Sequence, residues 1–199
     1  MIQWYTQLHD VRPNLDHPTA LIAASDVLDT LPPLSRDQLA DAAHGGLPSV
    51  RRRQLLCALA ARVLDITPVA VRLGIASDER RYVRGTNVFA SVAYRSGVAA
   101  VALAHEPIGI DVESIDEALA AGSVALNGFD GNVSALAAWH GPAGVWTAKE
   151  AALKALSKDL TNCIGQWQFD DMAIAYDCKA SRNVAHIALG HTIACVVVV

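Results

Sequence analysis

The sequence has few charged residues and no excess of positive charge. Charged residues make up 18% of the chain, and the formal net charge is −4. Proteins that bind nucleic acid or anionic membranes usually carry a basic surplus, so this composition argues against both classes. We therefore expect no nucleic-acid partner and no membrane partner, and any positive charge that binds phosphate must be local.

Cysteine and long hydrophobic runs are also scarce. Cys57, Cys163, Cys178 and Cys195 form no CxxC pair and have no histidine at the spacing of a zinc site. We interpret them as free thiols of a reducing cytosol. The first residues lack the basic and apolar regions of a signal peptide, and the apolar run at 194–199 is too short to span a bilayer. These observations predict a cytoplasmic protein.

Motifs of the commonest nucleotide-binding folds are missing as well. The sequence contains no P-loop and no dinucleotide-binding glycine pattern. The histidines, among them His140 and His186, have no partner at the spacing of a metal site or a catalytic triad. We interpret them as non-catalytic residues, and catalysis, if present, must use other side chains.

Hydrophobic residues make up 52% of the chain, which is enough for a substantial core. Apolar residues at helical spacing predict helices over 35–43, 49–64 and 146–156. The expected strands are 1–11 in part, 69–73, 88–92, 98–104, 108–112, 167–169, 172–176 and a hairpin over 184–199 that turns near Gly190. Three segments lack a clear pattern: 19–31 is expected to be irregular or partly helical, 78–86 a charged loop, and 118–138 a broken helix or loop.

This order of elements predicts an α+β fold. Helices followed by strands occur twice along the chain, which indicates two pseudo-duplicated α/β lobes of similar plan. We place the N-terminal lobe at 1–105 and the C-terminal lobe at 106–199, with a site at their junction. The sequence shows no convincing repeat, so the duplication is inferred from the element order alone.

The first informative motif is the run Gly-Ile-Asp-Val-Glu at 109–113. Because side chains alternate along a strand, Asp111 and Glu113 project to the same side. Two carboxylates this close repel each other unless a cation lies between them. The alternative interpretation is a strand end at which both acids are simply hydrated.

The second motif is the run Trp-Thr-Ala-Lys-Glu-Ala-Ala-Leu-Lys at 146–154. Glu150 and Lys154 are one helical turn apart and share a face, whereas Lys149 lies about 100° around the helix. Three acids and two lysines in these motifs suggest a site that holds a phosphorylated ligand through Mg²⁺. The alternative is an exposed Glu150–Lys154 pair that contributes a few tenths of a kcal/mol.

Together the two motifs resemble the paired signature of the 4′-phosphopantetheinyl transferases, and the length resembles the larger, two-lobed, monomeric branch of that family. The resemblance implies transfer of phosphopantetheine from coenzyme A to a serine of an acyl or peptidyl carrier protein. It implies that Asp111, Glu113 and Glu150 bind Mg²⁺. Glu150 matches the candidate general base, Lys154 the residue that neutralises or protonates the leaving phosphate, and Lys149 a residue near the pyrophosphate.

The same resemblance implies a coenzyme A site on the N-terminal lobe. Arg53 aligns with a basic residue of that site, and Arg80 or Arg81 falls where relatives carry a basic loop. Solvated loop arginines are the alternative interpretation. Relatives also carry Ser-His-Ser before an apolar strand, whereas this chain has Ala93, Tyr94 and Arg95.

This departure leaves two interpretations open. Arg95 is a possible bidentate phosphate partner, and Tyr94 a possible hydrogen-bond donor or a ring that stacks on adenine. Equally, the chain suits a catalytically impaired relative that binds a carrier protein or nucleotide as a scaffold or regulator. The expected function is nevertheless Mg²⁺-dependent phosphopantetheine transfer by a monomer.

Overall fold

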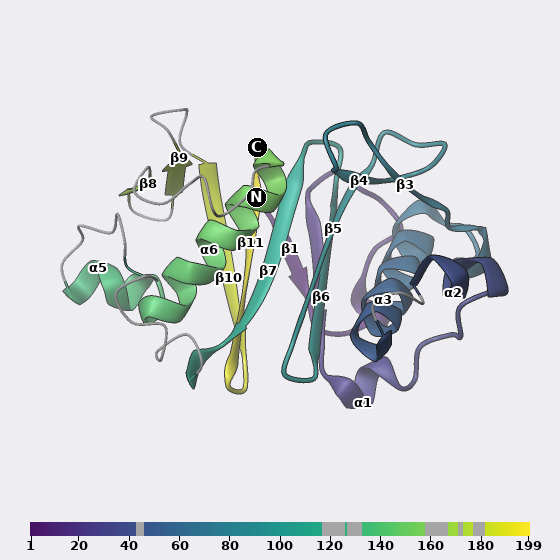
Figure 1. The fold of residues 1–199 in the computed structure, drawn as a ribbon, viewed down its shortest axis with the longest axis horizontal. Coiled ribbons are helices and arrows are strands. Elements are labelled where there is room, and N and C mark those ends of the chain that lie inside the picture. Colours follow the sequence, from purple (N-terminus) through teal and green to yellow (C-terminus); the bar gives the residue numbers. More distant parts are fainter. Residues whose placement is uncertain (43–45, 117–125, 127–132, 158–166, 171–172, 177–181) are drawn as a thin grey trace.

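The structure is a computed structural model with an α+β fold (Figure 1), and it describes residues 1–42, 46–116, 126, 133–157, 167–170, 173–176 and 182–199. The first, six-stranded sheet has the order β1-β2-β6-β5-β4-β3. Its strands are β1 (Gln3–Tyr5), β2 (Thr19–Ala23), β3 (Leu73–Ile75), β4 (Arg81–Val83), β5 (Phe89–Arg95) and β6 (Val98–Ala104).

The second sheet has five strands in the order β7-β11-β10-β9-β8. These are β7 (Ile108–Ser114), β8 (Trp167–Asp170), β9 (Ala173–Tyr176), β10 (Arg182–Leu189) and β11 (Thr192–Val198). The helices are α1 (Ser25–Leu28), α2 (Arg36–Ala42), α3 (Gly46–Leu64), α5 (Val133–Ala138) and α6 (Gly141–Leu156), with 3-10 turns η1 (Leu8–Asp10) and η3 (Pro68–Ala70).

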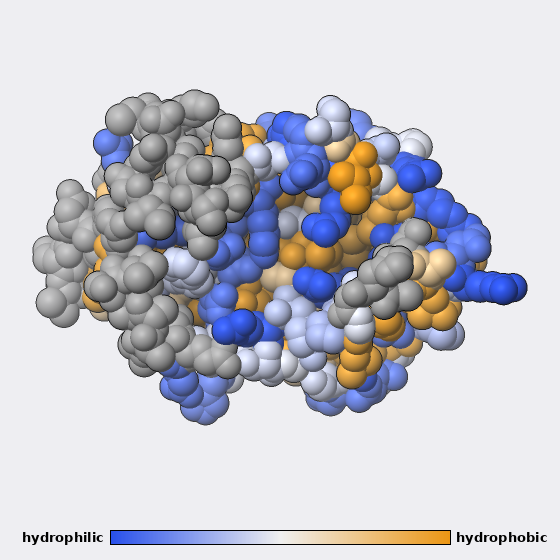
Figure 2. All heavy atoms as spheres, viewed as in Figure 1, coloured by the Kyte–Doolittle hydropathy of each residue, from blue (hydrophilic) through white to orange (hydrophobic). Residues whose placement is uncertain are grey.

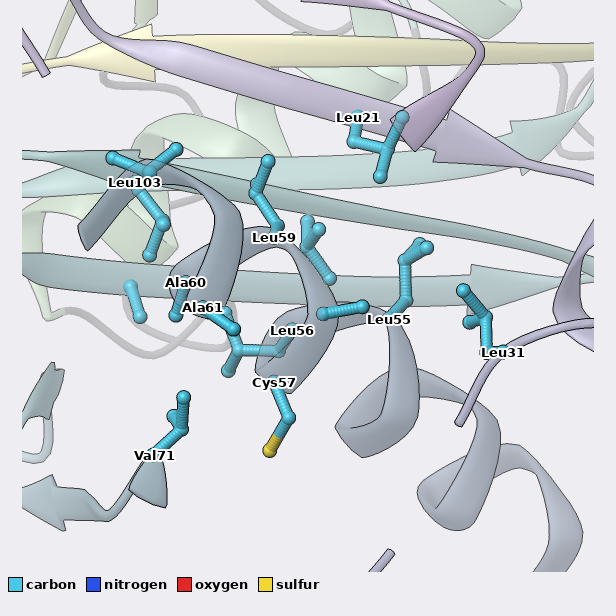
Figure 3. Packing of buried hydrophobic residues seen from close by; sticks show 14 of the residues in the cluster. Leu21, Leu31, Leu55, Leu56, Cys57, Leu59, Ala60, Ala61, Val71 and Leu103 are labelled. Atoms are coloured by element: carbon cyan, nitrogen blue, oxygen red, sulfur yellow. The ribbon is translucent and has the colours of Figure 1, made fainter. Parts of the chain in front are cut away.

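The two long helices lie on opposite sides of the paired sheets. Figure 1 shows α3 at the right and α6 at the left, with β5, β6 and β7 between them. Alternation along β6 explains the layering: Val101 and Leu103 face the α3 core, whereas Ala100 and Ala102 face the second sheet. Figure 3 shows Leu55, Leu56 and Leu59 of α3 in that first core with Leu103.

Small side chains fill the space between the two sheets. Alanines of β2, β5, β6 and β11 pack there against Ile108, Ile110 and Val112 of β7. Small residues allow two sheets to approach closely, and Ser91 Oγ of β5 accepts a 3.0 Å hydrogen bond from the Ile110 backbone N–H of β7. The two sheets are therefore joined directly beside the Gly-Ile-Asp-Val-Glu motif.

Most of the expected elements are present. Helices α2, α3 and α6 cover the predicted helices, although α6 begins five residues before the predicted start, at Gly141. Strands β5 to β7 and the hairpin of β10 and β11 also agree with the predictions. Ser96 and Gly97, both with positive φ, make the two-residue turn of the β5–β6 hairpin. Of the segment 118–138, only Leu126 and 133–138 lie within the described residues.

Two predictions were wrong, and a third was right only in part. The segment 19–31 contains helix α1, as expected of a partly helical segment. Its residues 19–23, however, form strand β2, whose five residues are all buried and therefore lack the alternation that marks a half-exposed strand. The charged loop expected at 78–86 contains strand β4, which pairs with β5. The strand expected at 69–73 is instead η3 followed by β3, because Pro68 favours a helical first turn.

Among the described helices, none combines the length and apolar character needed to cross a membrane.

Candidate functional site

The two sequence motifs meet where α6 lies on β7. A Cβ atom at Gly109 would lie 1.8 Å from the Ala151 carbonyl oxygen and 2.7 Å from the Ala155 backbone nitrogen, so only glycine fits. Ala151 and Ala155 are themselves fully buried. Small residues on both elements therefore allow the backbone of α6 to contact β7. This contact sets the position of α6 relative to Asp111 and Glu113 of β7.

Alternation along β7 directs the motif acids toward this helix. Ile110 and Val112 point into the space between the sheets, so Asp111 points to the α6 side with Gly109. Lys154 Nζ donates to Asp111 Oδ1 at 2.6 Å and to the Ile110 carbonyl oxygen at 3.1 Å. The structure thus joins one acid of the first motif to the last lysine of the second.

The three candidate acids lie close enough to influence one another. Burial raises the pKa of Asp111, although Lys154 opposes that shift. Burial and the Asp111 charge raise the pKa of Glu150, and burial with the charges of Asp111 and Glu150 raises the pKa of Glu113. Clustered carboxylates with raised pKa values form an oxygen-rich site that a cation would stabilise.

The residues fit a hard divalent cation. Asp111 Oδ2 is buried and has no hydrogen-bond partner in the described structure, which leaves one carboxylate oxygen available as a ligand. All three acids offer only oxygen donors, the type that Mg²⁺ prefers. Among the described residues, however, no group of three or more Asp, Glu, His or Cys side chains is already arranged to hold a metal ion. Cation binding would therefore require side-chain adjustment.

Glu113 has two partners that are not acids. The Trp146 side chain, from the first residue of the helix motif, hydrogen-bonds to its carboxylate. Arg95 Nε lies 3.4 Å from Glu113 Oε2. The Glu113 side chain is 15% exposed and that of Arg95 is 47% exposed, so this ion pair lies at the rim of the site.

The positions that differ from the Ser-His-Ser pattern point in different directions. Tyr94 packs with Val92 against the α3 core, whereas Ala93 lies between the sheets and is 3% exposed. Arg95 reaches the second sheet through Glu113. Tyr94 and Arg95 therefore lie on opposite faces of β5. A single ligand group cannot contact both side chains from one face of the strand.

A basic pocket lies between α3 and the edge of the first sheet. Its volume is about 430 Å³, and its rim carries the four arginines Arg52, Arg53, Arg81 and Arg84. Burial and the charges of Arg52 and Arg53 lower the pKa of Arg81, which shows how closely the guanidinium groups gather. Among the described residues that line it, none is acidic. Figure 2 shows hydrophilic side chains around a recess with a hydrophobic floor on this face.

A second cleft, of about 580 Å³, shares Arg81 with the basic pocket and extends to Lys154. Glu79 and Arg80, which precede β4, line it with Arg81 of β4 and Ser91 of β5. Lys154 and Ser157 also line it. Arg80 Nε donates to Asp78 Oδ2 at 2.7 Å. Arg80 and Arg81 therefore share this cleft with Lys154, which contacts Asp111.

Lys149 is more deeply buried than Lys154. Its side chain is 2% exposed, and Nζ lies 5.7 Å from the centroid of the Phe169 ring of β8. Burial lowers the pKa of Lys149 to about 8. Lys154 is the lysine that shifts the pKa values of Asp111 and Glu150.

Sequence reasoning did not assign a ligand-binding role to three residues of this region. Arg52 and Arg84 complete the basic pocket, and their clustering with Arg53 and Arg81 was a signal available in the sequence. Ser91 lines the junction cleft and binds the Ile110 backbone. An isolated serine on a strand carries no sequence pattern that would single it out.

The sequence matches no family model and no curated protein.

Proposed function

We propose that this protein transfers the 4′-phosphopantetheine group of coenzyme A to a serine of an acyl or peptidyl carrier protein, with Mg²⁺ as cofactor. The observation that carries the proposal is the junction of two separate motifs: Lys154 of α6 lies 2.6 Å from Asp111 of β7, beside Glu150 and Glu113. The two-lobed branch with a division near residue 105 is part of the same proposal, as are the cytoplasmic location and the monomeric state.

Asp111, Glu113 and Glu150 are the residues that would hold Mg²⁺. A bound Mg²⁺ supplies charge stabilisation to the pyrophosphate oxygens during substitution at the β-phosphorus. Asp111 is the best placed ligand, because its Oδ2 atom is buried without a partner. Glu150 has a pKa raised by burial, which suits a carboxylate that accepts the proton of the carrier serine.

In this proposal, Lys154 neutralises the leaving 3′,5′-adenosine bisphosphate. Its side chain is 35% exposed and borders the cleft that also contains Arg80 and Arg81. An ammonium group fixed by the Ile110 carbonyl stabilises charge on a phosphate oxygen without reorganisation. Lys149 keeps its proposed place near the pyrophosphate only if the bound ligand extends toward Phe169.

The basic pocket is the proposed site of the adenosine bisphosphate part of coenzyme A. Arg53 and Arg81 offer guanidinium donors to the 3′-phosphate, and Leu56, Leu73 and Gly74 supply a less polar wall for the base. Carrier domains are acidic, so the same arginine-rich face also suits a carrier protein that approaches with its serine arm.

The proposal is tested by mass spectrometry of apo carrier proteins after incubation with coenzyme A and Mg²⁺. We expect each modified carrier to gain the mass of one phosphopantetheine arm. Asp111→Asn and Lys154→Ala should each slow transfer by about 100-fold or more, the usual loss when one electrostatic contributor is removed. The matched control is Arg72→Gln, because Arg72 pairs with Asp37 of α2 and not with the site acids. No mass gain over a range of fatty-acid, polyketide and peptide carriers would contradict the proposal.

One observation favours a second candidate function, that of a carrier- or nucleotide-binding relative without transferase activity. Ala93 is 3% exposed between the sheets, so a position that carries a phosphate-binding side chain in the resembled family offers none here. Calorimetry separates the two functions. A scaffold would bind carrier protein without Mg²⁺-dependent binding of coenzyme A, whereas the enzyme requires that binding.

A further inference from the structure

Arg95 is the basic residue of the site whose partner differs most from what the motifs predict. It ends β5 in the first sheet, and its Nε atom lies 3.4 Å from Glu113 Oε2 in the second sheet. The sequence suggests a phosphate group of the ligand as a possible partner of Arg95. In the structure Arg95 instead contacts Glu113, a candidate cation ligand. The following inference rests on the proposed function.

The two ion pairs of the site differ in strength. Lys154 lies 2.6 Å from Asp111 and is held in addition by the Ile110 carbonyl, and the Asp111 side chain is 9% exposed. The Arg95–Glu113 pair is longer, and nearly half of the Arg95 side chain is exposed. Exposed ion pairs change an equilibrium constant by at most about fivefold, so the Arg95–Glu113 pair is the one that a divalent cation breaks more readily.

A cation at the carboxylates also acts directly on Arg95. It takes up the negative charge that attracts the guanidinium group, and it repels that group as a like charge. Arg95 has a long side chain at a hairpin end, and its exposure leaves it rotamer freedom. A guanidinium group released at the rim of a phosphate site is a bidentate donor to phosphate oxygens.

We propose that Arg95 and the divalent cation compete for Glu113, and that the cation releases Arg95 to bind a phosphate group of the substrate. Arg95 is thus a substrate-binding residue that becomes available only once the metal is bound. Binding of the cation then strengthens binding of the phosphorylated ligand through the protein, in addition to any direct contact between the two. Without a metal, Arg95 then offsets part of the negative charge of the empty site.

The first test measures Mn²⁺ binding by electron paramagnetic resonance in the absence of substrate. Arg95→Gln should bind Mn²⁺ about two- to fivefold more tightly than wild type, because Glu113 loses its cationic partner and keeps only the hydrogen bond from Trp146. Glu113→Gln should bind Mn²⁺ more weakly, and the Arg95→Gln, Glu113→Gln double variant should equal Glu113→Gln. The control, Arg72→Gln, removes the same charge from a half-exposed arginine paired with Asp37 and should leave Mn²⁺ affinity unchanged.

The second test measures coenzyme A affinity by calorimetry with and without saturating Mn²⁺, after correction for coenzyme A–Mn²⁺ binding in a blank. Arg95→Gln should weaken coenzyme A binding severalfold with Mn²⁺ and leave it unchanged without the metal. Arg95→Lys should bind coenzyme A more tightly than Arg95→Gln but more weakly than wild type. Lysine keeps the positive charge but cannot form the bidentate hydrogen bonds of a guanidinium group. A purely structural Arg95 would change both conditions equally.

The outcomes separate this proposal from the proposed function. If Asp111→Asn abolishes Mn²⁺ binding but Arg95→Gln does not tighten it, competition at Glu113 is wrong and the metal site stands. If wild type binds no Mn²⁺, or if Asp111→Asn leaves that binding unchanged, both proposals are overturned. Weaker Mn²⁺ binding by Arg95→Gln would also contradict the competition, because it would mean that Arg95 supports the ligand.

Discussion

Helices α3 and α6 each cover the outer face of one sheet, but they do so with different side chains. In α3, Leu55, Leu56 and Leu59 are buried against the first sheet. In α6, alanines make the contact, and Gly109 of β7 leaves no room for a side chain. Large side chains hold a helix away from a sheet and leave space at its end for a pocket. Small side chains allow the helix and strand backbones to approach closely, which holds the polar side chains of both elements near one another.

The polar residues of the two helices follow from this difference. Arg52 and Arg53 of α3 line a pocket of about 430 Å³ together with Arg81 and Arg84. In α6, Lys154 instead contacts Asp111 of β7, and Glu150 is close enough for the Asp111 charge to raise its pKa. One helix therefore offers a wide basic pocket suited to a large anionic ligand, and the other offers a tight acidic site suited to a small cation. The proposed reaction needs both.

The largest expected effect comes from removing the close contact of α6 with β7. Gly109→Ala places a methyl group within 1.8 Å of the Ala151 carbonyl oxygen, so the backbone must move. We expect a loss of about 4 kcal/mol in the free energy of unfolding, at the upper end for single substitutions. Urea denaturation measures it. Wild-type stability for this variant would show that α6 does not lie so close to the strand.

The corresponding change on the other side removes one of the large side chains of α3. Leu59 is fully buried, and Leu59→Ala should lower the free energy of unfolding by about 3 kcal/mol through lost packing and a cavity. Urea denaturation again measures stability. Because the first core contains no site acid, Mn²⁺ affinity of the folded variant should equal that of wild type. A large change in Mn²⁺ affinity would contradict the separation of the two cores.

A pH effect is expected at the first turn of α6, where His186 of β10 lies 3.1 Å from the Gly144 carbonyl oxygen. Burial lowers the pKa of His186 to about 4, so the folded protein favours the neutral ring. Stability is then fully present above the ordinary histidine pKa and is lost as the pH falls toward 4. Between pH 8 and pH 5 the loss should be about 2 kcal/mol.

Thermal denaturation of His186→Gln across this pH range checks the assignment. The variant keeps a donor for Gly144 but cannot protonate, so its acid sensitivity should be smaller than that of wild type. His105→Gln, at an exposed turn, is the control and should follow wild type. Equal pH profiles for all three proteins would rule out His186 as the source.

The smallest expected effect is a gain in stability from removing one site acid. The pKa of Glu150 is raised by burial and by Asp111, so its stabilising contribution is present at low pH and is lost as the pH rises through the raised value. At pH 7 without a divalent cation, Glu150→Gln should therefore raise the melting temperature by about 2 °C. Differential scanning calorimetry measures this shift, and added Mg²⁺ should stabilise wild type but not the variant. A melting temperature of Glu150→Gln below that of wild type in the absence of metal would contradict repulsion between Glu150 and Asp111.

The helices and strands next to the site could be predicted from the sequence, because β7 and α6 each carry a clear period. Strand β2 could not, since burial of both faces removes its alternation. The Arg95–Glu113 contact was also beyond reach, because it depends on how two sheets pack against each other. The proximity of Lys154 to the acids was foreseen, whereas the burial of Lys149 beside Phe169 was not, because helical spacing gives no information on which sheet residue lies opposite.

The most direct test of the central claim is anomalous diffraction from crystals soaked with Mn²⁺ and coenzyme A. We expect one strong peak within ligand distance of Asp111 and Glu150, with the pyrophosphate beside Lys154 and the adenosine end among the arginines of the basic pocket. A peak elsewhere, or side chains of Asp111 and Glu150 too far apart to share the ion, would contradict the account.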